Sequence, residues 1–374
     1  MTLDVAEAPA FAFDDEPLEW DFHGTEQVQR AERLSHALSA LTAHHVANCD
    51  GYRSIVEAMF PEWADPDHRA TTLADIPFLP VGIFKERRLA SFPESELFKT
   101  LTSSGTTGAA VSQVLLDRQT ARRQTKALST TMQTVLGPTR RPMLLVESED
   151  VVRNRTSFSA RAAGVVGMMS FGRAHKYLLD SNMSANREQL DAFLESVGDQ
   201  RPLLFGFTFM VWQHLYKELA GQDIDLSGAT LIHSGGWKKL EEERVSNDDF
   251  KARLLDAFGI TEVVNFYGMA EQVGSVFLEG TDGLLHTAPF ADVIIRNPQT
   301  WQEQPVGEPG LIQVLSAVPT GYPGHSILTE DLGVVEQVDS DHTPHRGKAF
   351  RVIGRVPKVE LRGCSDTYAS NTNG

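Results

Sequence analysis

Six consecutive small residues offer a place where a backbone could bind phosphate: Ser103, Ser104, Gly105, Thr106, Thr107 and Gly108. Glycines let the backbone approach a phosphate group closely, while the hydroxyls and backbone N–H groups donate to its oxygens. No Gly-Lys-Ser/Thr follows, so this is not a Walker A loop. The segment predicts a phosphate-binding loop, and the alternative interpretation is a solvated turn between two strands.

A second candidate is NFYGMAE, residues 265–271. The ring of Tyr267 can stack on a purine, and Gly268 allows a tight turn. The carboxylate of Glu271 is a hard oxygen ligand of the kind that Mg²⁺ prefers. Taken alone, the segment fits the end of a strand followed by a surface glutamate equally well.

A third candidate, SGGWKK at residues 234–239, follows another short apolar run. Ligands of open α/β sheets bind beyond the carboxyl ends of strands, so Gly235 and Gly236 are expected to share one site with Tyr267. Lys238 is a candidate cation for that site. The alternative for Lys238 and Lys239 is a solvated helix start.

Shorter signals lie near the end of the chain. Asp331, in Thr-Glu-Asp, could accept from ribose hydroxyls, and Arg355, in Gly-Arg, could bind ribose or phosphate, although such residues are common in surface turns. Cys364 follows Arg-Gly and is a candidate nucleophile, because a neighbouring cation favours the thiolate; the alternative is a spectator cysteine. Cys49 is expected to be a small buried apolar residue.

The composition argues against several classes of protein. The 374 residues carry 34 Lys and Arg against 50 Asp and Glu, a net charge of −16, which argues against a general nucleic-acid binder. Two cysteines are too few for a disulfide framework. The first residues do not resemble a secretory signal, and the densest apolar run, residues 203–212, is about half of a membrane span. We expect a cytoplasmic protein without a membrane span.

The elements that must position these residues alternate along the chain. Apolar periodicity predicts helices over residues 25–49, 52–59 and 118–136, and strands over 143–148, 202–207, 229–234 and 263–267. After about residue 280, alternating strands separated by Pro-Gly turns predict a β-rich subdomain. The expected division is an N-terminal helical and extended region (1–100), an α/β nucleotide-binding core (101–280), the β-rich subdomain (281–353), and a hinge remnant with a C-terminal tail (354–374).

The order of these motifs resembles the adenylate-forming enzymes, and within them the acyl-protein synthetase subunit of the luminescence fatty acid reductase complex. The resemblance runs from IPFLPVGIFKERRLAS through SSGTTG to VPKVELRGCS. It implies an α/β fold of layered sheets, the large N-terminal domain of that superfamily. It also implies ATP-dependent activation of a carboxylic acid, expected to be a fatty acid, to acyl-AMP with Mg²⁺, followed by transfer to a thiol. The protein would be an acid–thiol ligase.

The resemblance also assigns roles. Residues 103–108 would hold the ATP phosphates, and Gly235 and Gly236 would line the adenine and acyl side. Tyr267 would lie near the adenine, Glu271 and Thr106 would place Mg²⁺, Asp331 and Arg355 would bind the ribose, and Cys364 would accept the acyl group as a thioester. Residues 162–171 and 205–212 are candidate walls of the acyl pocket.

Two departures from the superfamily leave alternatives open. Most members continue for about a hundred residues past the Gly-Arg pair into a lid domain with a catalytic lysine, whereas here 20 residues follow Gly354, so we expect a truncated lid. Lys238 is preferred as its replacement over Lys239, Lys85 or Lys358. The usual acidic hinge residue is also replaced, by Val-Pro-Lys at 356–358.

Two other functions remain open. One is a ligase that passes the acyl group to an external amine, CoA or carrier protein. The other is a non-catalytic nucleotide-binding scaffold. The partners that the resemblance implies are an acyl reductase and an acyl donor enzyme.

Overall fold

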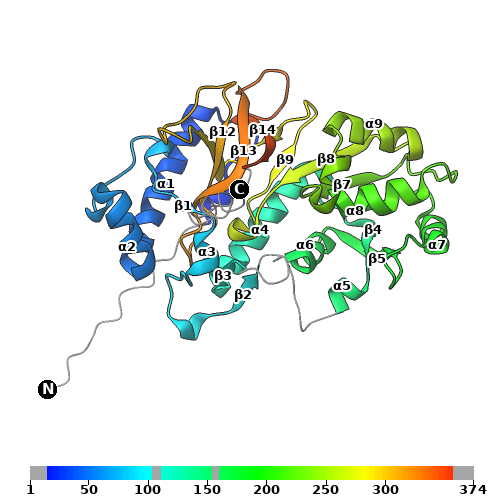
Figure 1. The fold of residues 1–374 in the computed structure, drawn as a ribbon, viewed down its shortest axis with the longest axis horizontal. Helices are drawn as coiled ribbons and strands as arrows, with labels where there is room; N and C mark the ends of the chain where they lie inside the picture. Colours follow the sequence, from blue (N-terminus) through cyan, green and yellow to red (C-terminus); the bar gives the residue numbers. More distant parts are fainter. Residues whose placement is uncertain (1–14, 103–110, 154–159, 357–374) are drawn as a thin grey trace, which may run out of the picture.

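The computed structural model describes residues 15–102, 111–153 and 160–356, apart from the side chains of Ala160, Lys238 and Lys239. Helices and strands alternate through most of this part of the chain (Figure 1). The α-helices are α1 (Gln27–Asn48), α2 (Asp50–Met59), α3 (Ile83–Glu86), α4 (Arg118–Leu136), α5 (Asp150–Arg153), α6 (Ala160–Met169), α7 (Arg187–Val197), α8 (Thr208–Met210) and α9 (Asn247–Phe258).

The strands form one large mixed sheet and a separate hairpin of β2 with β3. The large sheet runs in the order β11-β12-β13-β14-β10-β9-β8-β7-β6-β4-β5, and β1 pairs with β13. The strands are β1 (Leu79–Pro80), β2 (Lys99–Thr102), β3 (Gln113–Leu116), β4 (Arg141–Ser148), β5 (Gly172–Leu179), β6 (Leu203–Phe207), β7 (Thr230–Ser234), β8 (Glu262–Tyr267), β9 (Phe277–Glu279), β10 (Leu285–His286), β11 (Ala291–Arg296), β12 (Gly310–Ser316), β13 (Ser326–Val338) and β14 (Lys348–Arg355).

Strands β5, β4, β6, β7 and β8 are parallel and form one half of the sheet, and β9 pairs antiparallel with β8 at its inner edge. Their apolar runs are buried on both faces, and successive side chains enter different cores. Leu144, Leu204 and Leu231 pack in a cluster with α7 and α9 residues, while Leu145 and Ile232 pack with residues of α4 and α6. This two-sided covering explains why the central strands β4, β6 and β7 are largely apolar, whereas β5, at the edge of the sheet, is partly exposed.

The strands after residue 280 pair mainly antiparallel, with β13 at the centre of that half. Their inner face packs against α1, whose Leu34, Leu38 and Leu41 are buried with residues of β11 and β12. Figure 1 shows this half, in orange and red, beside the blue helices α1 and α2.

The predicted helices and the α/β fold class are confirmed. Helix α4 has the predicted bounds. Gly137 caps its C-terminus with a φ of +68°, a backbone angle that glycine adopts readily. The predicted strands correspond to β4, β6, β7 and β8, in the same sheet. Strands β5 and β13 were not predicted. The assignment of residues 1–100, 101–280, 281–353 and 354–374 to separate units stays a prediction.

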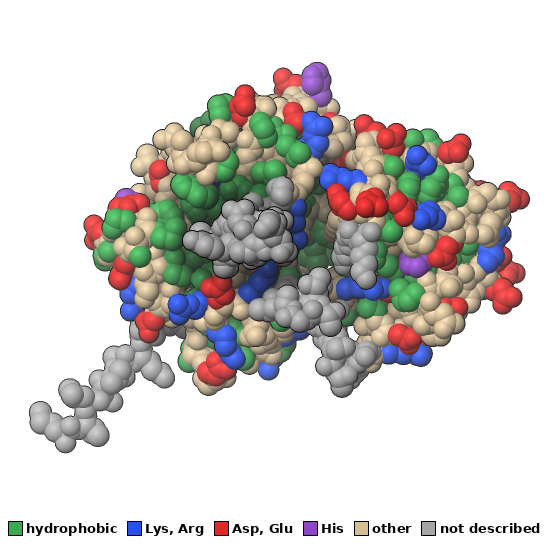
Figure 2. All heavy atoms as spheres, in the orientation of Figure 1, with side chains coloured by type: hydrophobic (Ala, Val, Ile, Leu, Met, Phe, Trp, Pro, Cys, Tyr) green, Lys and Arg blue, Asp and Glu red, His purple; other side chains and the backbone are tan. Residues whose placement is uncertain are grey.

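Charge is mixed over the molecular surface. Figure 2 shows Lys and Arg side chains interspersed with Asp and Glu over one face rather than gathered together. In the part of the chain that the structure describes, no helix is both long enough and apolar enough to cross a bilayer.

A glycine between β8 and β9 lies where the chain passes helix α4 closely. Gly274 has a φ of +94°, and a Cβ there would lie 2.7 Å from Cα of Gln124 and 2.8 Å from its carbonyl oxygen. Gly137 also has a positive φ but has nothing within 4 Å. We predict that Gly137→Ala lowers the free energy of unfolding by about 1 kcal/mol and Gly274→Ala by about 3 kcal/mol, because only the second adds a backbone clash. Urea denaturation measures both; equal losses would contradict this explanation.

Candidate functional site

The carboxyl ends of three parallel strands bring the predicted loops together. Phe207 of β6 is in register with Ser234 of β7, and Ser234 is in register with Phe266 of β8. Gly235 therefore follows β7 beside the end of β8, as expected. Its φ is +83°, and a Cβ there would lie 3.5 Å from the Phe207 ring, so a glycine fits this turn. Gly236 follows it and is exposed.

Three of the predicted site residues meet at one carboxylate. The hydroxyl of Tyr267, at the end of β8, donates to Oδ2 of Asp331 at 2.7 Å. Nε of Arg355 donates to Oδ1 of the same carboxylate at 3.3 Å. Asp331 and Arg355 are directly paired in the β13–β14 ladder, so the two strands hold these side chains together.

Neighbouring residues position the Tyr267 ring and keep its hydroxyl protonated. The ring makes an edge contact with Phe350 of β14, at a centroid distance of 6.2 Å. Burial of the hydroxyl raises the pKa of Tyr267 well above its usual value, and the negative charge of Asp331 raises it further. Tyr267 therefore stays neutral and remains a hydrogen-bond donor. A carboxylate accepts at about four lone-pair positions, so Asp331 can also accept from a ligand's hydroxyls.

Glu271 lies in the short 3₁₀ helix Ala270–Gln272, directly after the Tyr-Gly turn. The residue is 7% exposed. Its backbone carbonyl accepts a hydrogen bond from the Tyr322 hydroxyl at 2.9 Å, whereas its carboxylate has no hydrogen-bond or ion-pair partner among the described residues. A buried carboxylate of this kind suits a cation. Among the described residues, no group of three or more His, Cys, Asp or Glu side chains could hold a metal.

Several predicted site residues lie outside the described part of the chain. These are Ser103, Ser104, Gly105, Thr106, Thr107, Gly108 and Cys364, and also the side chain of Lys238. Their roles stay predictions. The backbone of Lys238 begins the 3₁₀ helix Lys238–Glu243, which follows Gly235 and Gly236. Gly268 follows Tyr267, and a Cβ there would lie 3.2 Å from Cγ1 of Val276.

An ion pair with a buried carboxylate, which the sequence did not reveal, supports the same strand. The carboxylate of Glu279, on β9, accepts from Nζ of Lys251 at 2.6 Å and from the backbone N–H of Asn265 at 2.9 Å. Lys251 comes from α9 and Asn265 lies two residues before Tyr267. The pair therefore holds β8 against α9 immediately before the candidate site.

A second ion pair lies at the carboxyl end of β4. Nε and Nη2 of Arg161, on α6, donate to the two carboxylate oxygens of Glu147, each at 2.5 Å. Helix α6 also places Gly164 against Phe207, because a Cβ at Gly164 would lie 3.2 Å from Cζ of that ring. No local motif identifies either ion pair, since each is made by tertiary packing.

His233 is a buried histidine one residue before the end of β7. Its Nδ1 lies 3.0 Å from the hydroxyl of Thr208, and its Nε2 has no hydrogen-bond partner in the described part of the chain. Burial lowers the pKa of His233 to about 3, and the positive charge of Lys251 lowers it further. The sequence predicted a structural or surface histidine, and the structure places it in the core.

Comparison with known families identifies the family to which this fold and site belong. The family model described as "Acyl-protein synthetase, LuxE" matches residues 3–372. The chain belongs to the LuxE acyl-protein synthetase family. It is therefore a ligase of the acyl-protein synthetase type.

Curated relatives match along nearly the whole chain. A long-chain-fatty-acid–luciferin-component ligase of Aliivibrio fischeri is 23% identical over 364 residues, covering 96% of this chain and 92% of the relative. The protein of the same name from Vibrio harveyi is 25% identical over 385 residues, covering 93% of this chain and 89% of the relative.

A solved structure shows the same fold. The open conformation of 2-hydroxyisobutyryl-CoA ligase, solved with 2-HIB-AMP and CoA, aligns with a TM-score of 0.69 at 16% identity. The alignment covers 91% of this chain and 78% of the ligase. The fold is thus that of the N-terminal domain of adenylate-forming ligases.

The buried imidazole of His233 predicts a pH dependence of stability. Its folded pKa of about 3 lies below the ordinary value of 6.5, so as the pH falls below 6.5 the unfolded chain takes up a proton that the folded chain does not. Between pH 7 and pH 5 this histidine should cost about 2 kcal/mol of stability. His233→Gln, which can still bond Thr208, should lose less stability over that range by about that amount. Urea denaturation at both pH values measures it, and identical losses would contradict it.

Proposed function

We propose that the protein activates a carboxylic acid, specifically a fatty acid, with ATP and Mg²⁺ to form acyl-AMP, and then transfers the acyl group to the thiol of Cys364. The observation that carries this proposal is the meeting of Tyr267, Asp331 and Arg355 at the carboxyl edge of the sheet, in a member of the LuxE family. The printed name of the curated relatives, a long-chain fatty acid ligase, supports the choice of acid.

The nucleotide would lie across the ends of β7 and β8 and the middle of β13, which carries Asp331. Asp331 would accept from the ribose hydroxyls, and Arg355, whose side chain is 70% exposed, would bind the ribose from the solvent side. The Tyr267 ring, with its hydroxyl tied to Asp331, would lie against the adenine, and Gly235 and Gly236 would let the base approach the backbone. Residues 103–108 would hold the phosphates.

The metal would bind at Glu271, with Thr106 as the second protein ligand. The fit rests on the buried carboxylate of Glu271, which lacks a described partner. Mg²⁺ needs only one or two carboxylates when phosphates complete its coordination, and it would supply charge neutralisation.

The two steps follow from the charges of the reactants. In the first, a carboxylate oxygen bonds to the α-phosphorus and pyrophosphate leaves; two anions meet, so cations and N–H donors must neutralise them. In the second, the thiolate sulfur of Cys364 bonds to the acyl carbon and AMP leaves. We propose Lys238 as the cation of the first step, because it follows Gly236 at the same edge. The proposal includes a cytoplasmic location and an acyl reductase, acyl donor or carrier protein as partner.

ATP–pyrophosphate exchange over a panel of fatty, aryl and amino acids tests activation. The expected result is exchange that depends on Mg²⁺ and on a fatty acid. Exchange with an aryl or amino acid instead would show that the substrate is not a fatty acid. No exchange with any acid would contradict activation and favour the scaffold function.

The cluster around Asp331 predicts an effect on ATP alone. Asp331→Asn removes the charge of the acceptor, so the KM for ATP should rise about tenfold or more while the KM for the acid stays unchanged. Tyr267→Phe removes one neutral hydrogen bond and should have a smaller effect of about threefold. Asp341→Asn is the matched control, because that carboxylate is 88% exposed and pairs with Arg346 on the surface. An unchanged KM for ATP in Asp331→Asn would refute the assignment.

Intact mass separates the two kinds of acceptor. Wild-type protein with ATP and the acid should gain the mass of one acyl group, which hydroxylamine removes. Cys364→Ser should lose this gain and keep pyrophosphate exchange, whereas Cys49→Ala should keep both. Exchange without any gain in mass in the wild type would show that the acceptor is external.

A further inference from the structure

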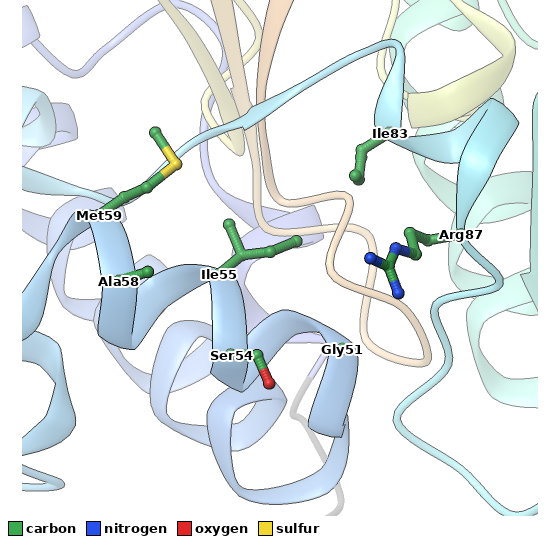
Figure 3. Close-up of a pocket in the computed structure, with 7 residues that line it drawn as sticks. All are labelled: Gly51, Ser54, Ile55, Ala58, Met59, Ile83 and Arg87. Carbon is green, nitrogen blue, oxygen red and sulfur yellow. The ribbon is translucent and has the colours of Figure 1, made fainter.

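A groove runs between helices α2 and α3, and none of the predicted nucleotide-site residues lines it (Figure 3). It has an open volume of about 310 Å³, which is at the lower end of the range for small-molecule pockets. Strand β1, directly before α3, pairs with Ile327 and Leu328 of β13. The segment that forms one wall of the groove therefore continues from a strand that pairs with β13, the strand that carries Asp331.

The wall that α2 contributes is largely apolar and lies at the margin of the core, against which Ile55 is partly buried. Tyr52 and Val56 fill the inner face of α2 and are buried. Ile55 and Met59 lie four residues apart on another face and line the groove, and Met59 is 52% exposed. Ile83 of α3 points into the groove from the opposite side (Figure 3). Apolar surface left open in this way gains about 25 cal/mol for each Å² that a ligand covers.

One end of the groove carries a cation. The guanidinium of Arg87 points into the space between the helices (Figure 3). Among the described residues it has no hydrogen-bond or ion-pair partner, whereas the next residue, Arg88, is paired with Glu94 at 3.1 Å. Near Arg87 the Leu89 side chain packs against helix α2, because a Cβ at Gly51 would lie 2.9 Å from Cδ2 of Leu89.

We propose that this groove binds the chain and carboxylate of a free fatty acid, apart from the nucleotide site. The carboxylate would pair with Arg87, and the chain would extend along Ile83 and Ile55 to Met59. From Gly51 to Met59, helix α2 offers a wall about 12 Å long at 1.5 Å per residue. The proposal rests on the proposed function for its choice of acid.

The polarity of the walls favours an acyl chain over a peptide. A peptide carries an N–H and a C=O at every residue, and each must find a partner when buried. The groove offers only one side-chain hydroxyl, that of Ser54, and it already donates to the carbonyl of Asp50 at 2.9 Å. An amphiphile with one anionic end needs one cation and an apolar wall, which is what the groove contains.

Photolabelling of the full chain tests this site directly. Dodecanoic acid with a diazirine at its far end is irradiated with the protein in the absence of ATP, and labelled peptides are mapped by mass spectrometry. We expect labelling within residues 51–59 and 83–87. Arg87→Gln should weaken this labelling about tenfold or more, and Met59→Glu should also weaken it, because each removes one part of the complementarity. Dodecanol with the same photoreactive group should label the groove weakly.

Arg88→Gln is the matched control, since it removes a neighbouring exposed arginine that does not line the groove; it should label like the wild type. Absence of labelling within residues 51–59 and 83–87, or labelling there that Arg87→Gln leaves unchanged, would overturn the proposal. Pyrophosphate exchange measured in parallel separates the two claims. Labelling in the groove without exchange would contradict the proposed function alone, and exchange without labelling in the groove would contradict this site alone.

Discussion

The carboxylate of Asp331 joins the two halves of the large sheet at the point where the candidate site forms. Tyr267 reaches it from the last parallel strand, and Arg355 reaches it from the antiparallel strand β14. A carboxylate at this position needs donors from both directions, because a partly buried charge is costly without partners. Burial, reinforced by the negative charge of Asp331, raises the pKa of Tyr267, so the tyrosine stays protonated and remains a donor.

Hydrogen bonds from two residues of strand β8, Asn265 and Tyr267, hold this strand in place. The backbone N–H of Asn265 donates to the buried carboxylate of Glu279, and the hydroxyl of Tyr267 donates to Asp331. Lys251 neutralises the buried carboxylate of Glu279, which would be costly to bury without a partner. The position of the Tyr267 ring therefore depends on a charge pair behind the strand as well as on the carboxylate in front of it.

The sequence predicted the regular part of the fold and the residues that meet at Asp331, but not the contacts that hold them. Periodicity identified α4 because its burial follows the helical repeat, and short continuous apolar runs identified β4, β6, β7 and β8 but not β5. Strand β13 was not recognised because Thr329, Glu330 and Asp331 interrupt its apolar pattern with polar residues beside the candidate site.

The ion pairs escaped sequence analysis for a different reason. Glu279 and Lys251 are 28 residues apart, and Tyr267 and Asp331 are 64 apart. No local pattern relates such residues. The order of motifs in a family placed Tyr267 and Asp331 in one nucleotide site, but their hydrogen bond was not predicted. The groove beside α2 was missed because a helix with two apolar faces resembles a core helix in sequence.

The charge balance at the candidate site gives a physical reason for including a metal in the mechanism. Among the described residues of the predicted site, two carboxylates, Asp331 and Glu271, stand against one guanidinium, that of Arg355. A triphosphate and a carboxylic acid add further negative charge, in a protein with a net charge of −16. A divalent cation that arrives with the nucleotide and binds Glu271 would offset this repulsion locally, and it would do so without a permanent basic patch on an acidic protein.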